Sequence, residues 1–336
     1  METRRKIQPR WPIPSQDDTL SIGNVMDDFI RHQVANARSM VTATSYRNSL
    51  RIFGYWLDEA HQGKDTKLEI VRDPYFIENY MMWLREVRHN AESSVAHHKR
   101  HLRIFLYWCM DRGYIPQFQI VVKNPQEVVP ETYTKEEMEK LLRKPKNKAD
   151  YVENRDWVII NLMIAVGNRR ATIVGYEMKD AEVEDGYLVM NQTKNKRGQR
   201  IPMPAQLVNI MKKYIETFRV DAKPSDPLFP NQFGTWLDPN ALTHSLAKYN
   251  KSRGVNKTGV HLFRHTFAKE WIKDGGGSLP LQKMLGHQSL PMTEKYVRLF
   301  SEDLTPFVEK HSPLGNYSQE KESINKRNRD RRRGRR

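Results

Sequence analysis

Residues 261–296 read HLFRHTFAKEWIKDGGGSLPLQKMLGHQSLPMTEKY, and this stretch decides the fold of the C-terminal half of the chain. Apolar residues recur in it at three- and four-residue spacing, which is typical of helices that bury one face. The pattern predicts three short helices, over 261–274, 278–285 and 291–299. A helical architecture is therefore expected at this end of the chain.

Chemically active side chains are concentrated in the same stretch. His261 and Arg264 stand three residues apart, so they lie on one face of the first helix and can reach the same group. His287 follows Gly286 directly, and Tyr296 comes nine residues after that histidine. Only this spacing distinguishes His287 from a structural histidine. Tyr296 is one of 14 tyrosines, and without the other candidate residues of the chain it would be interpreted as a core tyrosine.

The residues upstream of this stretch complete the same domain. An apolar run that starts at Trp157 predicts a buried helix, which ends at a glycine turn followed by Arg169. Between 180 and 203 the spacing becomes strand-like, with one turn at Asp185-Gly186 and a second hairpin that carries Lys194. This segment predicts a small three-stranded antiparallel sheet. Two further helices are expected over 205–218 and 239–251.

The N-terminal part of the chain has a helical pattern. Residues 24–112 contain four segments of apolar periodicity, which predict a small helical bundle, and Pro74 is expected to open its third helix. The stretch 116–133 holds three prolines and no helical period, so it is interpreted as a linker. Thr134 and Glu137 then form a capping box, which begins a second domain. The predicted fold is mostly α, with one small antiparallel β-sheet.

Charge and cysteine content narrow the classes of function. The 336 residues contain 56 lysines and arginines against 40 acids, a formal charge of +16, which indicates a polyanionic partner. The segment 326–336 has eight basic residues against one acid, a net charge of +7. It is interpreted as a disordered arm that contacts phosphates, with a solubilising tail as the alternative. Because Cys109 is the single cysteine, a disulfide framework and a cysteine zinc site are excluded.

No segment predicts secretion or membrane insertion. The start, METRRKIQPRWPIP, is charged and has no apolar stretch behind it. The most apolar run, 157–167, is far shorter than the roughly 20 residues that span a bilayer. The chain is therefore expected in the cytoplasm, associated with the nucleoid and with no membrane partner.

Six side chains together suit phosphodiester chemistry. Cleavage needs a nucleophile, an acid for the leaving oxygen, and positive charge where the phosphorane becomes negative. A tyrosine can attack and keep the phosphodiester energy in a covalent bond, while two arginines brace the phosphorane. The set consists of Arg169, Lys194, His261, Arg264, His287 and Tyr296. It requires no cofactor, neither a metal nor ATP, and the sequence shows no paired-carboxylate metal site.

Four motifs agree in order and spacing with one family: VGNRR at 166–170, TKNKRGQRIPMP at 193–204, HLFRHTFA at 261–268 and LGHQSLPMTEKY at 285–296. On these residues the chain resembles the tyrosine recombinase, or phage integrase, family of site-specific recombinases. The resemblance implies a helical, SAM-like core-binding domain and an α+β catalytic domain. The expected organisation is an N-terminal extension at 1–20, the core-binding domain at 21–115, a linker at 116–133, the catalytic domain at 134–311 and a basic disordered tail at 312–336.

The resemblance also implies a role for each group. Arg169 and Arg264 would clamp the scissile phosphate, and His287 would hydrogen-bond it. His261 would assist proton transfer to or from the nucleophile, Tyr296, which would form a 3′-phosphotyrosyl bond. Four protomers would act on two double-stranded DNA sites through a Holliday junction.

Two of these assignments have competitors nearby. Lys194 would protonate the departing 5′-oxygen, but Lys196 and Arg197 lie in the same basic turn, where we expect them to contact DNA. Arg169 adjoins Arg170, and its Gly-x-Arg placement makes Arg169 the better candidate.

Two further positions bear on the site. His265 follows Arg264 directly and is interpreted as a core or helix-packing histidine that points away from the His261/Arg264 face. The family usually carries an acidic residue three positions after the first arginine, and here that position is Thr172. A missing carboxylate would leave the neighbouring cations less well oriented, which would slow the enzyme or pass the task to another side chain.

Further DNA contacts are expected from the first domain, where one helix is crowded with basic side chains. The candidate DNA-binding residues there are Arg47, Lys99, Arg100 and Arg103. Ordinary capping and solvation is an equal alternative for the segment around Arg47. His97 and His101 are four residues apart, but no third ligand is near them, so no metal is expected.

Three functions remain open on the sequence alone. The first is a site-specific recombinase, either an integrase or transposase of a mobile element or a resolvase. The second is a type IB topoisomerase-like nicking and closing enzyme, and the third is a non-catalytic DNA-binding protein with a relic site. The intact set of six groups disfavours the third. The segment 299–311 has an apolar face that would pack on a neighbouring protomer or on its own chain.

Overall fold

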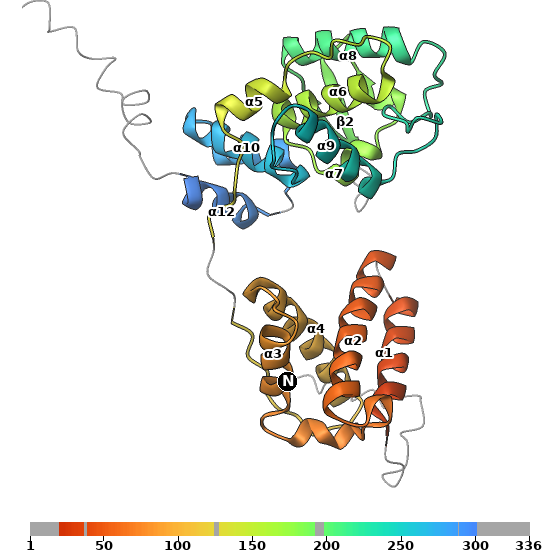
Figure 1. Ribbon diagram of the computed structural model, residues 1–336, viewed down its shortest axis with the longest axis vertical. Helices are drawn as coiled ribbons and strands as arrows, with labels where there is room; N and C mark the ends of the chain where they lie inside the picture. Colours follow the sequence, from red (N-terminus) through yellow and green to blue (C-terminus); the bar gives the residue numbers. More distant parts are fainter. Residues whose placement is uncertain (1–19, 37–38, 124–127, 192–197, 288, 301–336) are drawn as a thin grey trace, which may run out of the picture. The chain divides into compact units, whose positions relative to one another are not determined.

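A computed structural model describes residues 20–36, 39–123, 128–191, 198–287 and 289–300. The chain divides into two compact units, 1–127 and 128–336 (Figure 1). This division falls inside the stretch 116–133, which the sequence predicts as a linker. The predicted tail at 312–336, and the predicted extension apart from Leu20, lie outside the described residues.

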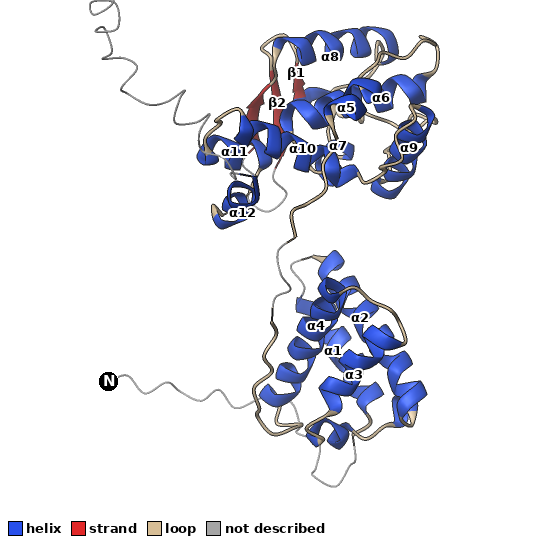
Figure 2. Cartoon of the chain, turned by 60° about the vertical axis from the view of Figure 1, so that its left-hand side comes forward, coloured by secondary structure: helices blue, strands red, loops and turns tan. Residues whose placement is uncertain are grey.

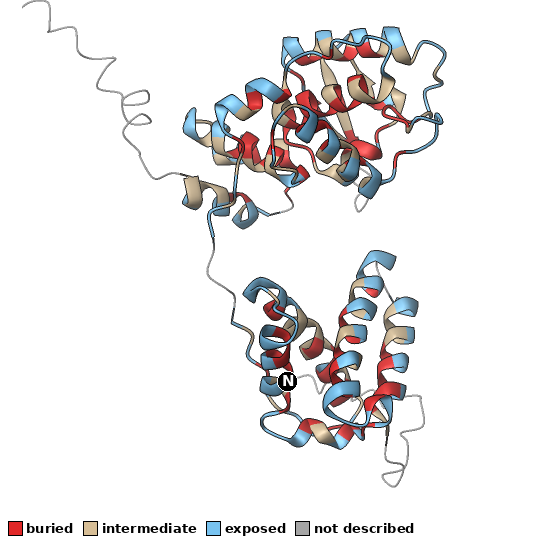
Figure 3. Cartoon of the chain, viewed as in Figure 1, coloured by how far each residue is buried: buried red, intermediate tan, exposed pale blue. Residues whose placement is uncertain are grey.

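Helices that bury aromatic side chains form the first unit. They are α1 (Ile22–Asn36), α2 (Met40–Ala60), α3 (Phe76–Glu86) and α4 (Glu92–Asp111), with 3-10 turns at Gly63–Asp65 and Leu68–Arg72. Phe53 meets Tyr80 edge to face at 5.0 Å between ring centroids, and Phe29 meets Phe105 in the same way at 5.5 Å. Figure 3 shows the buried residues of all four helices on the faces turned toward one another. Burial of these apolar faces holds the bundle together.

The third helix begins later than predicted. The sequence places its start at Pro74, but α3 starts at Phe76. The Asp73 carboxylate accepts a hydrogen bond from the backbone N–H of Tyr75 at 2.9 Å, and the Asp73 carbonyl accepts one from Phe76 at 3.0 Å. These bonds make a separate turn of residues 73–76, so Asp73 and Pro74 precede the helix.

The second unit combines helices with one small sheet, and the predicted fold class is confirmed. Its strands, β1 (Ala181–Glu182), β2 (Tyr187–Asn191) and β3 (Gly198–Pro202), are ordered β1-β2-β3 and pair antiparallel, with Leu188 opposite Ile201. Before the sheet come α5 (Lys135–Leu141), α6 (Tyr151–Val166), α7 (Arg170–Val174) and a 3-10 turn, Met178–Asp180. After it come α8 (Ala205–Phe218), α9 (Pro239–Ser252), α10 (Val260–Lys273), α11 (Ser278–Leu285) and α12 (Pro291–Phe300).

Helix α6 is the centre of this unit. It packs against both α8 and α10, and Figure 1 shows it between them. Ile159, Ile160 and Leu162 are fully buried, so the helix buries more than one face. It begins earlier than the predicted Trp157, because the Asp150 carboxylate accepts the Glu153 N–H at 3.0 Å and caps the helix there.

Local hydrogen bonds tie the other elements to this core. Thr134 and Glu137 form the predicted capping box, with bonds of 3.2 and 2.8 Å between side chain and backbone. Figure 2 shows the strands beside α8, toward the part of the unit that carries α11. The Gln199 side chain on β3 donates to the Lys283 carbonyl on α11 at 2.9 Å. Within the described ranges, no helix has the length and apolar character that spanning a membrane requires.

Candidate active site

The end of α6 sets the position of the first predicted arginine. Gly167 has a left-handed backbone, with φ of 68°, and leads through Asn168 into Arg169, the N-cap residue of α7. The Asn168 Oδ1 accepts a hydrogen bond from the Tyr176 hydroxyl at 3.1 Å, which holds this turn in place. A Cβ at position 167 would lie 2.4 Å from Phe267 Cδ1 on α10. Only glycine therefore fits the turn without a shift of its neighbours.

A Gly167→Ala substitution is expected to lower the free energy of unfolding by about 2 to 4 kcal/mol. A left-handed backbone costs an alanine about 1 to 2 kcal/mol, and overpacking against Phe267 adds a cost of about the same size. Gly254→Ala is the matched control, since Gly254 also has a positive φ, of 70°, but open space around its Cβ position. Urea unfolding of both variants measures the difference. Equal losses would contradict the steric role of the close contact.

Arg264, on α10, is the most deeply placed cation of the cluster, with 5% of its surface exposed. Its Nη1 donates to the Gly167 carbonyl at 2.8 Å, and its Nη2 donates to the Leu285 carbonyl at 3.0 Å. Burial and the neighbouring Arg169 lower the pKa of Arg264 to about 10, while Tyr296 raises it in part. The guanidinium stays charged at neutral pH and is fixed by the ends of α6 and α11.

Arg169 reaches the same end of α11. Its Nη1 donates to the carbonyls of Leu285 and Gly286, at 3.3 and 3.2 Å. Gly286 ends α11 with a left-handed backbone, and this turn aims both carbonyls at the arginines. Both guanidinium groups therefore donate to the Leu285 carbonyl, which places positive charge from α7 and α10 side by side.

His287 is held between Arg264 and α12. Its Nε2 accepts a hydrogen bond from Arg264 Nη2 at 2.7 Å, so Nδ1 carries the ring proton and donates to Thr293 Oγ1, also at 2.7 Å. Burial, followed by the charges of Arg264 and Arg169, lowers the pKa of His287 to about 4. The imidazole is thus neutral at physiological pH, and both its nitrogens are engaged.

Tyr296, on α12, points into this cluster. Its Oη lies 2.9 Å from His265 Nδ1, within hydrogen-bond distance. Its ring stacks with the His287 imidazole at 6.1 Å between centroids, with the planes 9° apart. Helix α12 packs on α10, which carries Arg264, and on α11, whose last carbonyls accept hydrogen bonds from both arginines. The phenol oxygen is thereby brought to the cluster.

His261 lies at the exposed start of α10. Partial burial lowers the pKa of His261 most, and the charges of Arg170, Arg264 and Arg169 lower it further, with Arg170 contributing the most of the three. The side chain of Arg170 turns toward α9, where its Nη1 donates to Thr243 Oγ1 at 2.6 Å. Arg169, and not Arg170, therefore takes the place beside Gly286.

Five of the six predicted catalytic side chains are thus brought together in the second unit: Arg169, His261, Arg264, His287 and Tyr296. Lys194 lies outside the described residues, as do Lys196 and Arg197. The structure therefore gives no place to the predicted leaving-group acid or its competitors.

His265 was misjudged from the sequence. It was expected to be a packing histidine that points away from the reactive face, but its Nδ1 contacts the Tyr296 hydroxyl. The signal that could have found it is its distance of four residues from His261, since positions i and i+4 share a helix face. A single helix turn thus carries His261, Arg264 and His265 toward the same region.

Comparison with known proteins identifies the family. Residues 131–303, just over half of the chain, match the phage integrase family. The chain belongs to the phage integrase family. It is a tyrosine recombinase, a DNA strand-transferring enzyme.

Relatives and solved structures extend this match to both units. The chain is 26% identical over 282 residues to tyrosine recombinase XerD of Pseudomonas aeruginosa, covering 82% of this chain and 92% of that protein. It is 28% identical over 291 residues to tyrosine recombinase XerC of Staphylococcus aureus, covering 84% and 94%. Its fold resembles the Tn1549 transposon integrase in complex with transposon right end DNA, with a TM-score of 0.67, 18% identity and coverage of 87% and 100%. It also resembles a lambda integrase tetramer bound to a Holliday junction, with a TM-score of 0.64, 15% identity and coverage of 83% and 78%.

This tyrosine recombinase orients its arginines without the acidic residue expected at position 172. The backbone N–H of Thr172 bonds the Arg169 carbonyl within α7. Within the described part of the chain, no carboxylate forms an ion pair with Arg169 or Arg264, and the carbonyls of residues 167, 285 and 286 accept from them instead. In the described structure, backbone carbonyls therefore orient Arg169, and backbone carbonyls together with the His287 imidazole orient Arg264.

Acidification is expected to weaken the second unit of this recombinase through His287. Its pKa is about 4 in the folded chain against 6.5 ordinarily, so the unfolded chain binds the proton first as the pH falls. The stability is fully present above pH 6.5 and is lost progressively between pH 6.5 and about 4. Urea unfolding across this range is expected to show a smaller pH dependence for His287→Gln than for the wild type. An unchanged pH dependence in the variant would contradict the assignment.

The first unit of the recombinase places its candidate DNA-binding residues on two helices. Arg47 is exposed on α2, and Lys99, Arg100 and Arg103 are half-buried on α4. Between these helices, Ser49 Oγ and His101 Nδ1 form a hydrogen bond of 2.7 Å, and burial lowers the pKa of His101 to about 4. His101 is thus a contact between helices, and no metal-binding group of three or more His, Cys, Asp or Glu occurs among the described residues.

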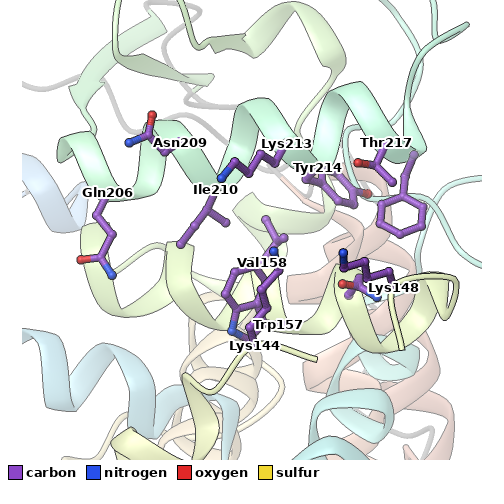
Figure 4. A pocket seen from close by; sticks show the side chains of 12 residues that line it. Lys144, Lys148, Trp157, Val158, Gln206, Asn209, Ile210, Lys213, Tyr214 and Thr217 are labelled. Carbon is purple, nitrogen blue, oxygen red and sulfur yellow. The ribbon is translucent and has the colours of Figure 1, made fainter. Parts of the chain in front are cut away.

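A cavity of about 480 Å³ lies between α6 and α8 (Figure 4). The rings of Trp157 and Tyr214 line it, and Lys144, Lys148 and Lys213 surround it. None of the five clustered candidate side chains lines it. The candidate active site and this cavity are therefore separate features of the second unit.

Proposed function

We propose that this recombinase cuts and rejoins double-stranded DNA through a 3′-phosphotyrosyl bond to Tyr296, as an integrase or transposase of a mobile element or as a resolvase. One observation carries the proposal. The Tyr296 oxygen lies in a cluster with a buried guanidinium, a second guanidinium and three imidazoles. These groups are what attack on a phosphodiester requires: a nucleophile, proton carriers and fixed positive charge.

The arginines would stabilise the pentavalent phosphorane. Each guanidinium uses part of its donor set on backbone carbonyls and keeps further N–H groups for phosphate oxygens. Because the carbonyls hold them before DNA arrives, little reorganisation is needed when negative charge develops. The resemblance implies a direct hydrogen bond from His287 to the phosphate, but both ring nitrogens are bonded, to Arg264 and Thr293. His287 would therefore act on the phosphate through Arg264.

Cleavage and rejoining would conserve the number of bonds to phosphorus. Tyr296 Oη forms a bond to phosphorus while the bond to the 5′-oxygen breaks, and Lys194 protonates that oxygen. In the reverse step the 5′-hydroxyl of a new strand attacks, and the tyrosine leaves. The phosphotyrosyl bond keeps the energy of the phosphodiester, so rejoining needs no ATP.

The assembly would be a homotetramer on two DNA sites. The lambda integrase structure that this fold resembles is a tetramer bound to a Holliday junction, and the Tn1549 structure contains transposon end DNA. The basic residues of α2 and α4 would bind the duplex, together with Lys196 and Arg197. The segment 299–311, which lies largely outside the described residues, would pack on a neighbouring protomer.

A covalent capture assay tests the proposal. The substrate is a pool of nicked duplexes with a randomised core, supplemented by duplexes that tile the DNA flanking the gene. We expect an SDS-resistant adduct between the protein and the 3′ end of the cut strand. Absence of an adduct from both pools, or attachment to a 5′ end, would overturn the mechanism. Relaxation of supercoiled plasmids of any sequence would indicate a type IB topoisomerase-like enzyme instead.

A further inference from the structure

His265 contacts the reacting oxygen of Tyr296, whereas the family resemblance assigns proton transfer to His261. The distance between His265 Nδ1 and Tyr296 Oη is 2.9 Å, and the two ring centroids are 5.6 Å apart. Within the part of the chain that the structure describes, no hydrogen bond joins His261 to Tyr296. The histidine placed for a proton exchange with the phenol is therefore His265.

The surroundings of His265 keep its imidazole neutral. Partial burial lowers its pKa below 6.5, and the charges of His261, Arg264 and Lys295 lower it further. His261 and Arg264 lie on the same helix, and Lys295 lies on α12, which packs against it. A neutral imidazole offers one nitrogen as an acceptor, and a nucleophilic hydroxyl needs such an acceptor.

The position of His265 is also rigid. It follows Arg264, whose guanidinium is bonded to the carbonyls of residues 167 and 285. The next residue, Thr266, is buried and accepts the backbone N–H of Tyr133 at 2.9 Å. This part of α10 is thus anchored on both sides of His265, so its ring can hold the Tyr296 oxygen at a fixed place beside the arginines.

We infer that His265 is a catalytic residue: its Nδ1 accepts the phenol proton of Tyr296 during attack and returns it when the tyrosine leaves. The inference rests on the proposed function. As the O–H bond of the phenol breaks, the Oη–P bond forms and the bond from phosphorus to the 5′-oxygen breaks. The imidazolium that results lies beside the phosphorane, whose negative charge offsets the repulsion from Arg264 and Lys295. Rejoining runs the same transfer backwards, so proton and charge balance over the cycle.

This leaves His261 for a different task. It lies at the exposed end of α10, among Arg169, Arg170 and Arg264. An imidazole in that position can donate to a non-bridging phosphate oxygen. The two histidines of the HLFRH motif, four residues apart, would then divide phosphate binding and proton transfer between them.

The test uses a nicked duplex that the covalent capture assay has identified. It measures the first-order rate of adduct formation on this duplex between pH 5 and 9. The variants are His265→Asn, His265→Ala and His261→Asn. The asparagine Oδ1 can take the place of Nδ1 as a hydrogen-bond acceptor but cannot carry the proton away. DNA binding by anisotropy and thermal unfolding are recorded for each variant, so that a rate is interpreted only for folded, DNA-bound protein.

We expect the wild-type rate to fall as the pH drops below 6.5, because protonated His265 cannot accept the phenol proton. His265→Asn is expected to lose about 10²- to 10⁴-fold in rate and to lack this acid limb, with DNA binding unchanged. Added imidazole is expected to restore part of the rate of His265→Ala in proportion to its free base. If His265 only packed against Tyr296, its substitution would not remove the acid limb of the rate, and added imidazole would not restore the rate of His265→Ala.

Two results would overturn the inference. One is a His265→Asn rate and pH profile equal to those of the wild type. The other is loss of the acid limb in His261→Asn but not in His265→Asn. Failure of the proposed function has a different signature in the same gels, since the wild type itself would then form no 3′ adduct.

Discussion

A Tyr296→Phe chain is expected to form no covalent adduct with any nicked duplex that captures the wild type. The substitution removes one oxygen, and that oxygen is the atom that would bond to phosphorus. The phenyl ring can still stack with His287 and pack on α10, so the cluster around it is retained. The loss of adduct should therefore be complete, and not a slower version of the same reaction.

The remaining properties of this variant should change little. It loses the hydrogen bond between Tyr296 and His265, which contributes about 1 kcal/mol or less at a partly exposed site. Tyr187→Phe is the matched control, because it makes the same chemical change on β2 of the same unit. SDS gels of labelled DNA, with thermal unfolding and anisotropy alongside, measure all three properties. An adduct formed by Tyr296→Phe, or lost in Tyr187→Phe, would contradict the assignment of the nucleophile.

An Arg264→Lys chain is expected to cleave at least about 10²- to 10³-fold more slowly than the wild type. Loss of a single preorganised donor to a developing oxyanion costs about this much. A lysine also lacks the planar fork that lets Arg264 bond to Gly167, Leu285 and His287 at the same time. The ammonium would remain charged, so long-range attraction to DNA should persist while the rate falls.

Arg219→Lys is the control for this change. Arg219 is a half-buried arginine whose Nη2 donates to a backbone carbonyl, that of Pro227, at 2.9 Å, at the end of α8. Both variants lose an arginine bonded to carbonyl oxygen, but only Arg264 belongs to the candidate site. Single-turnover cleavage rates on the captured duplex measure the effect. If the two variants cleaved equally fast, the clamp assigned to Arg264 would be wrong.

The predicted roles of Arg169 and Arg264 depend on backbone carbonyls whose direction the motifs do not specify. The carbonyls of Gly167, Leu285 and Gly286 point into the cluster because α6 and α11 both end in left-handed glycines. Unpaired carbonyls at a helix C-terminus carry partial negative charge, which favours cations. The same geometry explains how the chain orients its arginines with Thr172 in the acidic position.

Periodic segments with clear ends could be predicted from sequence. The helices over 205–218 and 278–285 have the predicted bounds, and the capping box at Thr134 forms as expected. Helix starts that depend on a local hydrogen bond were not predicted correctly. Asp73 forms a turn before α3, and Asp150 caps α6. Helix α7 was missed as well, because five residues between a glycine turn and Gly175 are too few to show a period.

The candidate site was predicted where residue type and spacing were sufficient. Arg169, His261, Arg264, His287 and Tyr296 could be named because each stands in a motif of fixed order. His265 could not be assigned in this way, since a helix has more than one face and the sequence does not say where α12 packs. Its contact with Tyr296 exists only because α10 and α12 meet.

The sequence by itself determined the charge of the chain, its mostly helical class and the chemical groups available for phosphodiester chemistry. Those properties follow from residue type and local spacing, which are read directly along the chain. The tertiary structure decided which nitrogen faces the Tyr296 oxygen and which atoms hold the arginines. Such choices depend on contacts between helices that are distant in sequence, where a shift of one helix turn would select other partners. Only the packed second unit, with the ends of α6 and α11 brought against α10, makes that selection.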